Sequence, residues 1–411
     1  MMEALYRIAT KCVGPLAIPL LRLLVRDPSE RNERLGRYEA LGTRRPIWIH
    51  AASAGETEGA EPIVREIRRA RPEADLVLTS MTAAGKRRAG RIPEVRSLYA
   101  PLDLEPAVRS AFDAIRPRAL LLVETEIWPN LLREASRRSV PVAIVNGRIS
   151  ARAFRRMRFA RPLYRAALAR VSLLGVQRAI DARRFAAFGV PAERIFVHGN
   201  TKIDSEGADP RDLGLRKHAD ERWVVFGSVR SGEQGAVLRA VRAVLAANEK
   251  HGVAVVPRHP ARAAEYLAAI GIPWSRWSEA RGSPGRAVLV DTIGDLLSFY
   301  AAADVAFVGG SLSRHGGHNP AEPARFGVPV LMGPHRENCR EIADLLEKAG
   351  ALEETCDSEA LARRILDLFA DDGERRRRGE AGRAALLAER GAAARCAGRL
   401  AREGLLGEVP A

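Results

Sequence analysis

The stretch VAFVGGSLSRHGGHNPAEPARFGVPVLMGP, residues 305–334, carries more information about the fold than any other part of this chain. An apolar run, VAFV, leads into a glycine-rich loop, after which Asn319 and Pro320 are typical of a helix cap and a first helical residue. A second apolar run, VPVLMG, follows. Strand, loop, helix and strand in this order predict parallel strands that are buried on both faces.

The same alternation continues through most of the chain. One series of apolar runs comprises PIWIHA, DLVLTS, ALLLVE, PVAIVNG, VSLLGVQ and RIFVHGN, and a second comprises WVVFGS, VAVVPRHP, AVLVDT and the stretch quoted above. Helix-like stretches such as EQGAVLRAVRAVLAANEK separate the runs. We therefore predict an α/β protein of GT-B type, with two Rossmann-like doubly wound domains facing a cleft. The pattern alone equally allows other paired nucleotide-binding domains.

The length and a change in composition predict where the domains divide. A chain of 411 residues suits two domains rather than one. Residues 206–222 combine turn formers and charges with little apolar periodicity, so we place the linker there. The prediction is an N-terminal segment at 1–30, a first domain at 31–205, and a second domain at 223–411 that ends in terminal helices.

The bulk composition limits the class of protein. The formal net charge of +16 favours a polyanionic partner, which could be nucleic acid, anionic lipid or a phosphorylated substrate. The four cysteines are scattered and form no CxxC pair, so neither a disulfide framework nor a zinc site is indicated. A reducing cytoplasm fits this cysteine usage.

The N-terminal segment contains the apolar run CVGPLAIPLL, with arginine or lysine on both sides. The run is too short to span a bilayer, which needs roughly 20 apolar residues, and Pro15 and Pro19 are expected to interrupt a helix. We favour anchoring at a membrane interface over a buried N-terminal helix, and over a signal peptide or membrane span.

Two acidic loops follow strands of the first series. Ser53 and Glu56 have the spacing of a helix capping box, but Glu56 also stands at the carboxyl end of a strand, where a general base could act. The helix dipole is expected to favour its ionised form. In VETEIWPN, Glu124 and Glu126 flank the end of a buried strand, which is costly unless they are solvated or paired. They are either a strand-to-helix junction or functional groups.

Residues 148–170 contain eight arginines and no acid, interleaved with aromatic and apolar side chains. This pattern favours an anionic surface over an ordinary solvated helix face, which usually carries acids as well. Nucleic acid would also satisfy the charge, but no nucleic-acid-binding signature accompanies it. The membrane- or acceptor-facing candidates are Arg148, Arg152, Arg155 and Arg156.

The second series offers candidates for phosphate binding. Ser228 lies in a small-residue loop between a strand and a helix, and Arg258 and His259 stand at another strand end, where the alternative is a turn fixed by prolines. In the glycine-rich loop, Gly316 and Gly317 permit close approach of a ligand to the backbone. Asn319 and Glu322 have capping spacing, but a loop, helix and carboxylate in this order also commonly hold a nucleotide.

Seven motifs together resemble one family. HAASAGE, ETEIWPN, NGRIS, GNTKID, FGS…GEQ, PRHP and GGHNPAEPA occur in the order and spacing of the Kdo (3-deoxy-D-manno-octulosonate) transferases of lipopolysaccharide synthesis. The resemblance covers nearly the whole chain. It implies an inverting glycosyltransferase that moves Kdo from CMP-Kdo to a lipid A precursor, lipid IVA. It also implies a monotopic or peripheral protein at the cytoplasmic face of the inner membrane, with no cofactor, no required metal and no nucleic-acid partner.

The resemblance also implies roles for single residues. Glu56 is the expected base toward the acceptor hydroxyl, and Glu124 and Glu126 are expected to support the acceptor or the donor sugar. Lys202 and Arg258 are candidates for the donor's phosphate or carboxylate. The residues expected to hold CMP are Ser228, Gly316, Gly317, Asn319 and Glu322, and His259 is a further candidate for binding the donor.

This sequence departs from the family's pattern at one place and leaves two rivals open. The family's FGS loop usually continues with Thr-His, whereas Val229 and Arg230 stand here, and Arg230 can still neutralise a phosphate. One rival is another GT-B transferase or an epimerase of that fold. The other is a basic binding protein for nucleic acid or anionic lipid.

Overall fold

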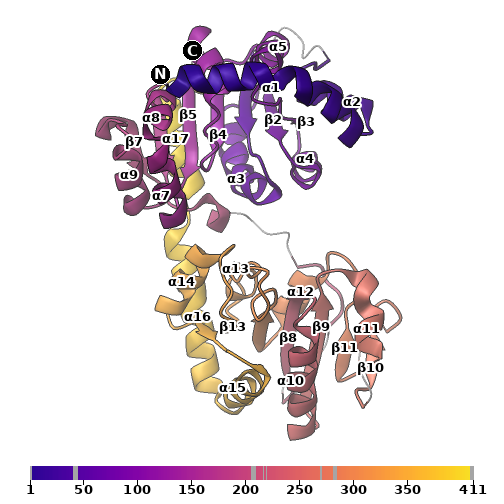
Figure 1. The fold of residues 1–411 in the computed structure, drawn as a ribbon. Helices are drawn as coiled ribbons and strands as arrows, with labels where there is room; N and C mark the ends of the chain where they lie inside the picture. Colours follow the sequence, from indigo (N-terminus) through magenta and orange to yellow (C-terminus); the bar gives the residue numbers. More distant parts are fainter. Residues whose placement is uncertain are drawn as a thin grey trace. The chain divides into compact units, whose positions relative to one another are not determined.

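The computed structural model describes residues 2–39, 45–204, 210–215, 217–218, 220–268, 271–280 and 285–407. The chain divides into two compact units (Figure 1). The first comprises Met1–Ser205 together with Glu389–Ala411, and the second comprises Glu206–Ala388. Part of the predicted linker at 206–222 lies outside the described residues, and its last residue already belongs to the first strand of the second unit.

The first unit is built on a parallel sheet of seven strands in the order β3-β2-β1-β4-β5-β6-β7. The strands are β1 (Ile47–His50), β2 (Leu76–Ser80), β3 (Val95–Tyr99), β4 (Ala119–Val123), β5 (Val142–Gly147), β6 (Leu173–Val176) and β7 (Ile195–Val197). The helices are α1 (Met2–Leu24), α2 (Pro28–Arg34), α3 (Ala54–Ala70), α4 (Ala83–Ala89), α5 (Glu105–Ile115), α6 (Pro129–Arg137), α7 (Ala151–Phe159), α8 (Arg161–Leu168) and α9 (Ala179–Ala186), with short 3₁₀ turns at Ala192–Arg194 and Thr201–Asp204.

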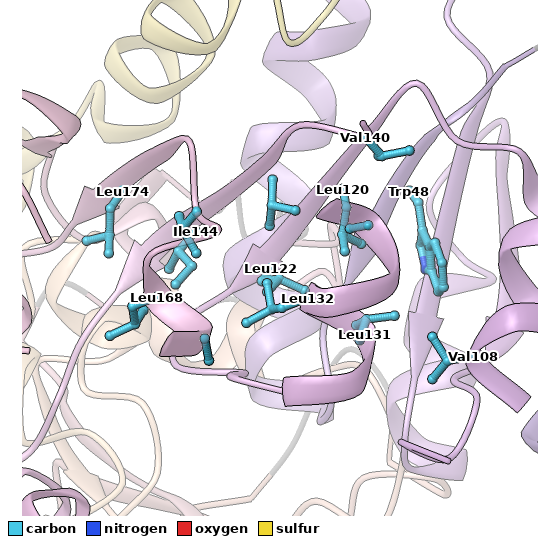
Figure 2. Packing of buried hydrophobic residues seen from close by; sticks show 14 of the residues in the cluster. Trp48, Val108, Leu120, Leu122, Leu131, Leu132, Val140, Ile144, Leu168 and Leu174 are labelled. Carbon is cyan, nitrogen blue, oxygen red and sulfur yellow. The ribbon is translucent and has the colours of Figure 1, made fainter. Parts of the chain in front are cut away.

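Apolar side chains cover both faces of this sheet, as the continuous apolar runs predict. On one face, Trp48, Leu122 and Ile144 from the strands form a cluster with Leu132 of α6 and Leu168 of α8 (Figure 2). A second cluster joins the other face to α3. The predicted doubly wound α/β arrangement is confirmed for this unit.

The second unit repeats the arrangement with the strand order β10-β11-β9-β8-β12-β13-β14, again all parallel. The strands are β8 (Arg222–Val229), β9 (His251–Pro257), β10 (Trp274–Arg276), β11 (Ala287–Leu289), β12 (Val305–Val308), β13 (Val330–Met332) and β14 (Leu352–Glu354). The helices are α10 (Gln234–Ala247), α11 (Ala263–Leu267), α12 (Leu296–Ala302), α13 (Ala321–Ala324), α14 (Arg340–Lys348), α15 (Ser358–Ala370) and α16 (Asp372–Glu389), with a 3₁₀ turn at Pro260–Arg262.

The terminal helices exist, but they do not both belong to the second domain as predicted. The last helix, α17 (Ala392–Arg402), packs on α3 of the first unit, and Ala393, Cys396 and Leu400 join its core. Asp204 fixes the start of α17 by accepting hydrogen bonds from the backbone N–H groups of residues 391 and 393, over 2.7 and 2.6 Å. The second domain therefore ends near residue 388 rather than 411.

Helix α1 runs through positions 15 and 19 without a break, so the prediction that prolines interrupt it was wrong. A proline removes one backbone hydrogen bond and kinks a helix, but it need not end one. Here the Tyr6 hydroxyl donates to Asp103 over 2.8 Å, and Thr10 accepts from Asn130 over 3.3 Å. Across the described residues, the structure contains no helix that is long and apolar enough to span a membrane.

Each sheet has one point at which the order of strand addition reverses. It lies between β1 and β4 in the first unit and between β8 and β12 in the second. The loops leaving two such strands run to opposite faces of the sheet, which opens a crevice at the carboxyl edge where α/β proteins bind ligands. Glu56 and Glu124 follow the first pair of strands, and Ser228 and the glycine-rich loop follow the second.

Candidate active site

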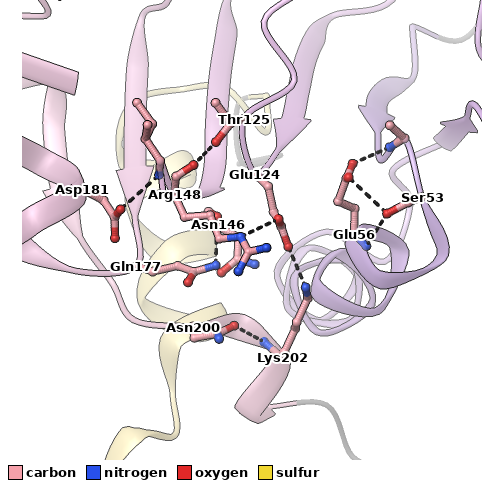
Figure 3. A network of polar contacts seen from close by, with 12 residues as sticks. Ser53, Glu56, Glu124, Thr125, Asn146, Arg148, Gln177, Asp181, Asn200 and Lys202 are labelled. Atoms are coloured by element: carbon pink, nitrogen blue, oxygen red, sulfur yellow. Dashed lines mark hydrogen bonds and ion pairs between the residues drawn. The ribbon is translucent and has the colours of Figure 1, made fainter. Parts of the chain in front are cut away.

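Glu56 lies in the first turn of α3, directly after β1 (Figure 3). Ser53 caps this helix by accepting from the Glu56 N–H over 3.3 Å. The Glu56 carboxylate accepts in turn from the Ala52 N–H over 2.6 Å and from the Ser53 hydroxyl over 3.1 Å. The predicted capping box is therefore present, and it fixes the orientation of the carboxylate.

The pKa of Glu56 is raised to about 7, first by burial and then by the negative charges of Glu126 and Glu124. The hydrogen bonds from Ala52 and Ser53 oppose the rise but do not cancel it. The expectation that the helix dipole would keep the group ionised was therefore wrong in its outcome. A carboxyl group with a pKa near 7 is partly ionised at neutral pH, and its carboxylate is basic enough to act as a general base.

Glu124 is a buried carboxylate held by two cations. Its Oε1 atom lies 2.7 Å from the Lys202 ammonium, and its Oε2 atom lies 2.9 Å from the Arg148 Nε atom (Figure 3). Its backbone is in the left-handed region, with φ 62°. Pairing makes the burial of this charge tolerable, as the sequence led us to expect.

Glu126 has a different environment two residues later. Its Oε2 atom accepts a hydrogen bond from the Trp128 indole over 2.7 Å, and its pKa is raised, mainly by burial and further by Glu124. The imidazole Nε2 of His50 lies 3.9 Å from the same oxygen. His50 is buried, which lowers its pKa to about 4, so it faces Glu126 as a neutral ring. His50 was not among the residues predicted for the site.

The NGRIS and GNTKID motifs form the support beneath these carboxylates. Asn146, with φ 55°, accepts from the Thr201 N–H over 3.1 Å, and this contact places Lys202 beside Glu124. A Cβ atom at Gly59 would lie 2.9 Å from the Asn146 amide nitrogen, so only glycine lets α3 approach this support closely. The structure thus brings Lys202 to the acidic cluster of the first unit.

The predicted basic surface divides into two parts. Arg148 reaches inward to Glu124, whereas Arg152, Arg155 and Arg156 are exposed on α7. Phe154 anchors α7 by packing edge-on against Phe188, with the ring centroids 5.6 Å apart. The arginines of α7 are therefore held outward by a buried aromatic contact.

In the second unit, a buried carboxylate organises the loops after β8 and β12. Glu233 is fully buried and accepts from the backbone N–H groups of Gly310 and Leu312, over 2.7 and 2.8 Å, and from that of Arg230 over 2.9 Å. Ser228, with φ 55°, stands at the end of β8 beside Gly309. Glu233 belongs to the GEQ motif but was not predicted as a site residue; its role depends on tertiary contacts that a sequence does not display.

The glycine-rich loop has the backbone geometry that its sequence predicts. Gly316 and Gly317 have φ values of 82° and 74°, and a Cβ at Gly316 would lie 2.5 Å from Asn338. Asn319 accepts from the Ala321 N–H over 3.0 Å just ahead of the short helix α13, which carries Glu322 in its first turn. The N-cap residue of α13 is Pro320, so the prediction of Asn319 as the cap and Pro320 as the first helical residue was wrong by one position. These glycines are needed for the loop itself, whether or not a ligand also approaches them.

The sequence of this chain is similar to that of known glycosyltransferases. Residues 29–205 match the family described as 3-deoxy-D-manno-octulosonic-acid transferase (kdotransferase), and residues 275–385 match the glycosyl transferases group 1. The chain is 34% identical to the 3-deoxy-D-manno-octulosonic acid transferase of Haemophilus influenzae over 92% of this chain and 93% of that protein. This chain belongs to the Kdo transferase family.

A second Kdo transferase, from Bordetella pertussis, is 34% identical over 85% of each chain. Among solved structures, the spinosyn rhamnosyltransferase SpnG matches with a TM-score of 0.57 at 15% identity, over 87% of this chain and 99% of that one. The latter likeness concerns the fold alone. The fold is of the GT-B type, and the Kdo transferase assignment makes the chain a glycosyltransferase rather than an epimerase or a simple binding protein.

Among the described residues, no group of three or more histidine, cysteine, aspartate or glutamate side chains is arranged to hold a metal ion. Metal-independent transfer stays a prediction.

Proposed function

We propose that this protein transfers Kdo from CMP-Kdo to a sugar hydroxyl of a lipid A precursor in lipopolysaccharide biosynthesis, with inversion at the anomeric carbon. Membership of the Kdo transferase family supports the sugar and the pathway. The observation that carries the mechanism is Glu56, a fixed carboxyl group whose pKa is raised to about 7 beside two other carboxylates.

In the proposed reaction, the Glu56 carboxylate removes the proton of the acceptor hydroxyl. The hydroxyl oxygen forms a bond to the anomeric carbon of Kdo, while the bond from that carbon to the CMP phosphate breaks and CMP leaves with the electron pair. One in-line displacement of this kind inverts the anomeric centre. General-base catalysis of this type contributes about 10²- to 10⁴-fold to a rate.

Glu124 and Glu126 have separate roles in this proposal because their surroundings differ. Glu124 forms ion pairs with Lys202 and Arg148 and serves to position those cations, which limit the negative charge near Glu56. Glu126 accepts a hydrogen bond from Trp128 through one oxygen, and we propose that its other oxygen accepts a hydrogen bond from a hydroxyl group of a bound sugar.

The second unit is proposed to bind the nucleotide of the donor. The exposed Arg258 and His259 follow β9, the neighbour of β8 in the sheet, and Arg230 follows β8 itself. Together with Ser228 and the backbone of Gly316 and Gly317, they supply donors and positive charge for a phosphate. Asn319 and Glu322 are proposed to complete the CMP site, Glu322 through the ribose hydroxyls.

We place the protein at the cytoplasmic face of the inner membrane, docked by its first unit. Helix α1 makes polar contacts to the unit through Tyr6 and Thr10, yet it leaves Leu5 and Ile8 each 58% exposed. Phe159, at the end of the arginine-bearing helix α7, is 89% exposed. Exposed apolar side chains beside cations suit an interface with anionic lipid, on which the acceptor also resides.

Transfer without a metal is part of the proposal, because the cationic side chains named above can stabilise the departing phosphate. Chelation by EDTA is expected to leave the transfer rate unchanged. A loss of activity that is restored by added magnesium would contradict this part of the proposal.

A transfer assay in detergent tests the proposed function. The purified protein is given a tetraacylated disaccharide bisphosphate and CMP-Kdo generated in situ, and the products are weighed by mass spectrometry. We expect mass increments of one or more Kdo units, with the anomeric configuration inverted as read by NMR. Wild-type protein that binds CMP but adds no Kdo would refute the donor sugar or the acceptor.

A further inference from the structure

His50 is the last residue of β1 and has no role in the mechanism above. Its side chain lies on the same face of the sheet as that of Trp48, two residues earlier, and His50 pairs in register with Thr79 of β2. The residue is only 2% exposed, and its buried Nε2 atom has no hydrogen-bond partner within the part of the chain that the structure describes. A buried polar atom without a partner is costly, so its position calls for an explanation.

The other ring nitrogen of His50 is anchored on β2. Its Nδ1 atom lies 3.0 Å from the Thr79 hydroxyl oxygen, which also accepts from the Trp48 indole N–H over 2.9 Å. The Thr79 hydroxyl can donate its own proton, and Nδ1 is a closer acceptor than the Ile49 carbonyl oxygen at 3.5 Å. Burial keeps the ring neutral by lowering its pKa to about 4, and a neutral ring that accepts at Nδ1 carries its proton on Nε2.

The Nε2 atom of His50 faces the carboxylate of Glu126, whose Oε2 atom lies 3.9 Å away. The same oxygen accepts from the Trp128 indole N–H over 2.7 Å, and the Trp128 ring meets the His50 ring edge-on, with the centroids 6.1 Å apart. A proton on Nε2 points a donor at this negative charge, whereas a proton on Nδ1 would leave a lone pair facing it. The Thr79 contact and the Glu126 charge therefore favour the same tautomer.

The sheet itself brings His50 to Glu126. Strands β1 and β4 are neighbours, and His50 pairs with Leu122, so the loop that carries Glu126 leaves the sheet beside the imidazole. The placement of Glu126 matters twice in the proposed mechanism, because its charge raises the pKa of Glu56 and its carboxylate is assigned to a sugar hydroxyl. A group that fixes this carboxylate therefore affects how the acceptor is bound.

We propose that His50 is a positioning residue that acts through Glu126: in the acceptor complex its Nε2–H group donates to Glu126 Oε2, so that the other carboxylate oxygen is presented to a hydroxyl of the acceptor sugar. Polar contacts in active sites are often long in the free enzyme and shorten in the substrate complex. A bond from a neutral donor to a carboxylate is strong enough to fix its orientation. This inference rests on the proposed function, in which Glu126 binds a sugar hydroxyl.

NMR of the full-length protein labelled with ¹⁵N-histidine reads the tautomer directly. The His50 signals are identified by their absence in His50→Gln and by the change that Glu126→Ala causes, since this variant removes the carboxylate that faces Nε2. We expect a neutral ring protonated on Nε2 at pH 7. A ring protonated on Nδ1 would overturn the inference.

Steady-state kinetics with the tetraacylated disaccharide bisphosphate test the positioning role. His50→Asn keeps a polar group for Thr79 but is too short to reach Glu126, whereas His50→Gln places an amide N–H group where Nε2–H stands. We expect the KM for the acceptor to rise about tenfold in His50→Asn with little change in kcat, and His50→Gln to restore most of the loss. His251→Asn, at a half-buried histidine of the second unit, is the matched control.

The Glu126→Ala background separates action through Glu126 from a general loss of packing. There, His50→Asn should not raise the KM for the acceptor further. An equal rise in both backgrounds, or an unchanged KM in His50→Asn alone, would overturn the inference. An unchanged KM in Glu126→Ala itself would instead refute the proposed role of Glu126, and wild-type protein that transfers no Kdo would refute the proposed function, so the failures are distinguishable.

Discussion

The Lys202 ammonium lies 2.7 Å from Glu124 Oε1, in the acidic cluster of the first unit. The family resemblance implied that Lys202 binds the donor, whereas we propose from this contact that Lys202 sets the charge around Glu56. Glu124 is one of the two carboxylates that raise the pKa of Glu56, and Lys202 and Arg148 both form ion pairs with it. In this proposal, Glu56 as the base depends on a cation that pairs with Glu124.

Lys202→Met is expected to raise the pKa of Glu56 further, because Glu124 then carries an uncompensated negative charge. The acidic limb of the pH–rate profile should move upward by about one pH unit, and the rate at pH 7 should fall about fivefold. Lys202→Arg should restore most of the shift. The control is Lys217→Met, which removes an ion pair with Asp304 in the second unit. A lower maximal rate with an unchanged apparent pKa of the acidic limb would contradict this role of Lys202.

Glu56→Gln is expected to stabilise the fold at high pH. The folded-state pKa of Glu56 lies above its ordinary value, so its contribution to stability is fully present below about pH 4.5 and is lost as the pH rises through about 7. Glutamine mimics the protonated form. The variant should therefore gain roughly 2 kcal/mol over wild type above pH 8 and little at pH 4.5.

Thermal melting from pH 4.5 to pH 9 measures this gain. Glu58→Gln, on the same helix, is the control, and its difference from wild type should not follow the same curve. A Glu56→Gln difference that is constant with pH would show that Glu56 carries no raised pKa.

Glu233→Gln should destabilise the second unit by about 2 to 3 kcal/mol, because an amide cannot accept from N–H groups through both of its terminal atoms. CMP affinity should fall with it, since Glu233 anchors both candidate phosphate loops. Urea unfolding and CMP titration measure the two effects. Glu265→Gln, in an exposed pair with Arg262, is the control, and an equal response of the two variants would contradict the anchoring role.

Replacing exposed apolar side chains of the first unit should weaken membrane binding without harming the fold. Leu5→Ser, Ile8→Ser and Phe159→Ser together should lower the fraction that floats with anionic vesicles by about tenfold or more. Leu387→Ser removes a comparably exposed leucine from α16 and should float like wild type. Equal flotation of both variants would contradict the proposal that the first unit binds the membrane.

Much of the fold and part of the site followed from the sequence, because strand alternation and capping are local. Both sheets and the Ser53–Glu56 box appear as predicted, whereas the predicted cap at Asn319 falls one residue later, at Pro320. The return of α17 to the first unit was missed, because an alanine- and arginine-rich amphipathic helix does not reveal which sheet it covers.

Local sequence patterns also did not predict which residues pair with the buried charged side chains. Lys202 meets Glu124 across 78 positions and Glu233 meets Gly310 across 77, so only the tertiary fold brings them together. Helix α1 continues through its prolines, and its first half is held by a long-range hydrogen bond from Tyr6 to Asp103. In each case the missing information was long-range pairing rather than residue type.

The most direct test of the account is the pH–rate profile of Kdo transfer by wild-type protein and Glu56→Gln, with Glu58→Gln as control. We predict that the wild-type rate rises with pH to a plateau above about pH 7, and that Glu56→Gln is about 10²- to 10⁴-fold slower and has lost this limb. A Glu56→Gln protein that transfers Kdo at the wild-type rate, with the same pH dependence, would contradict the assignment of Glu56 as the base.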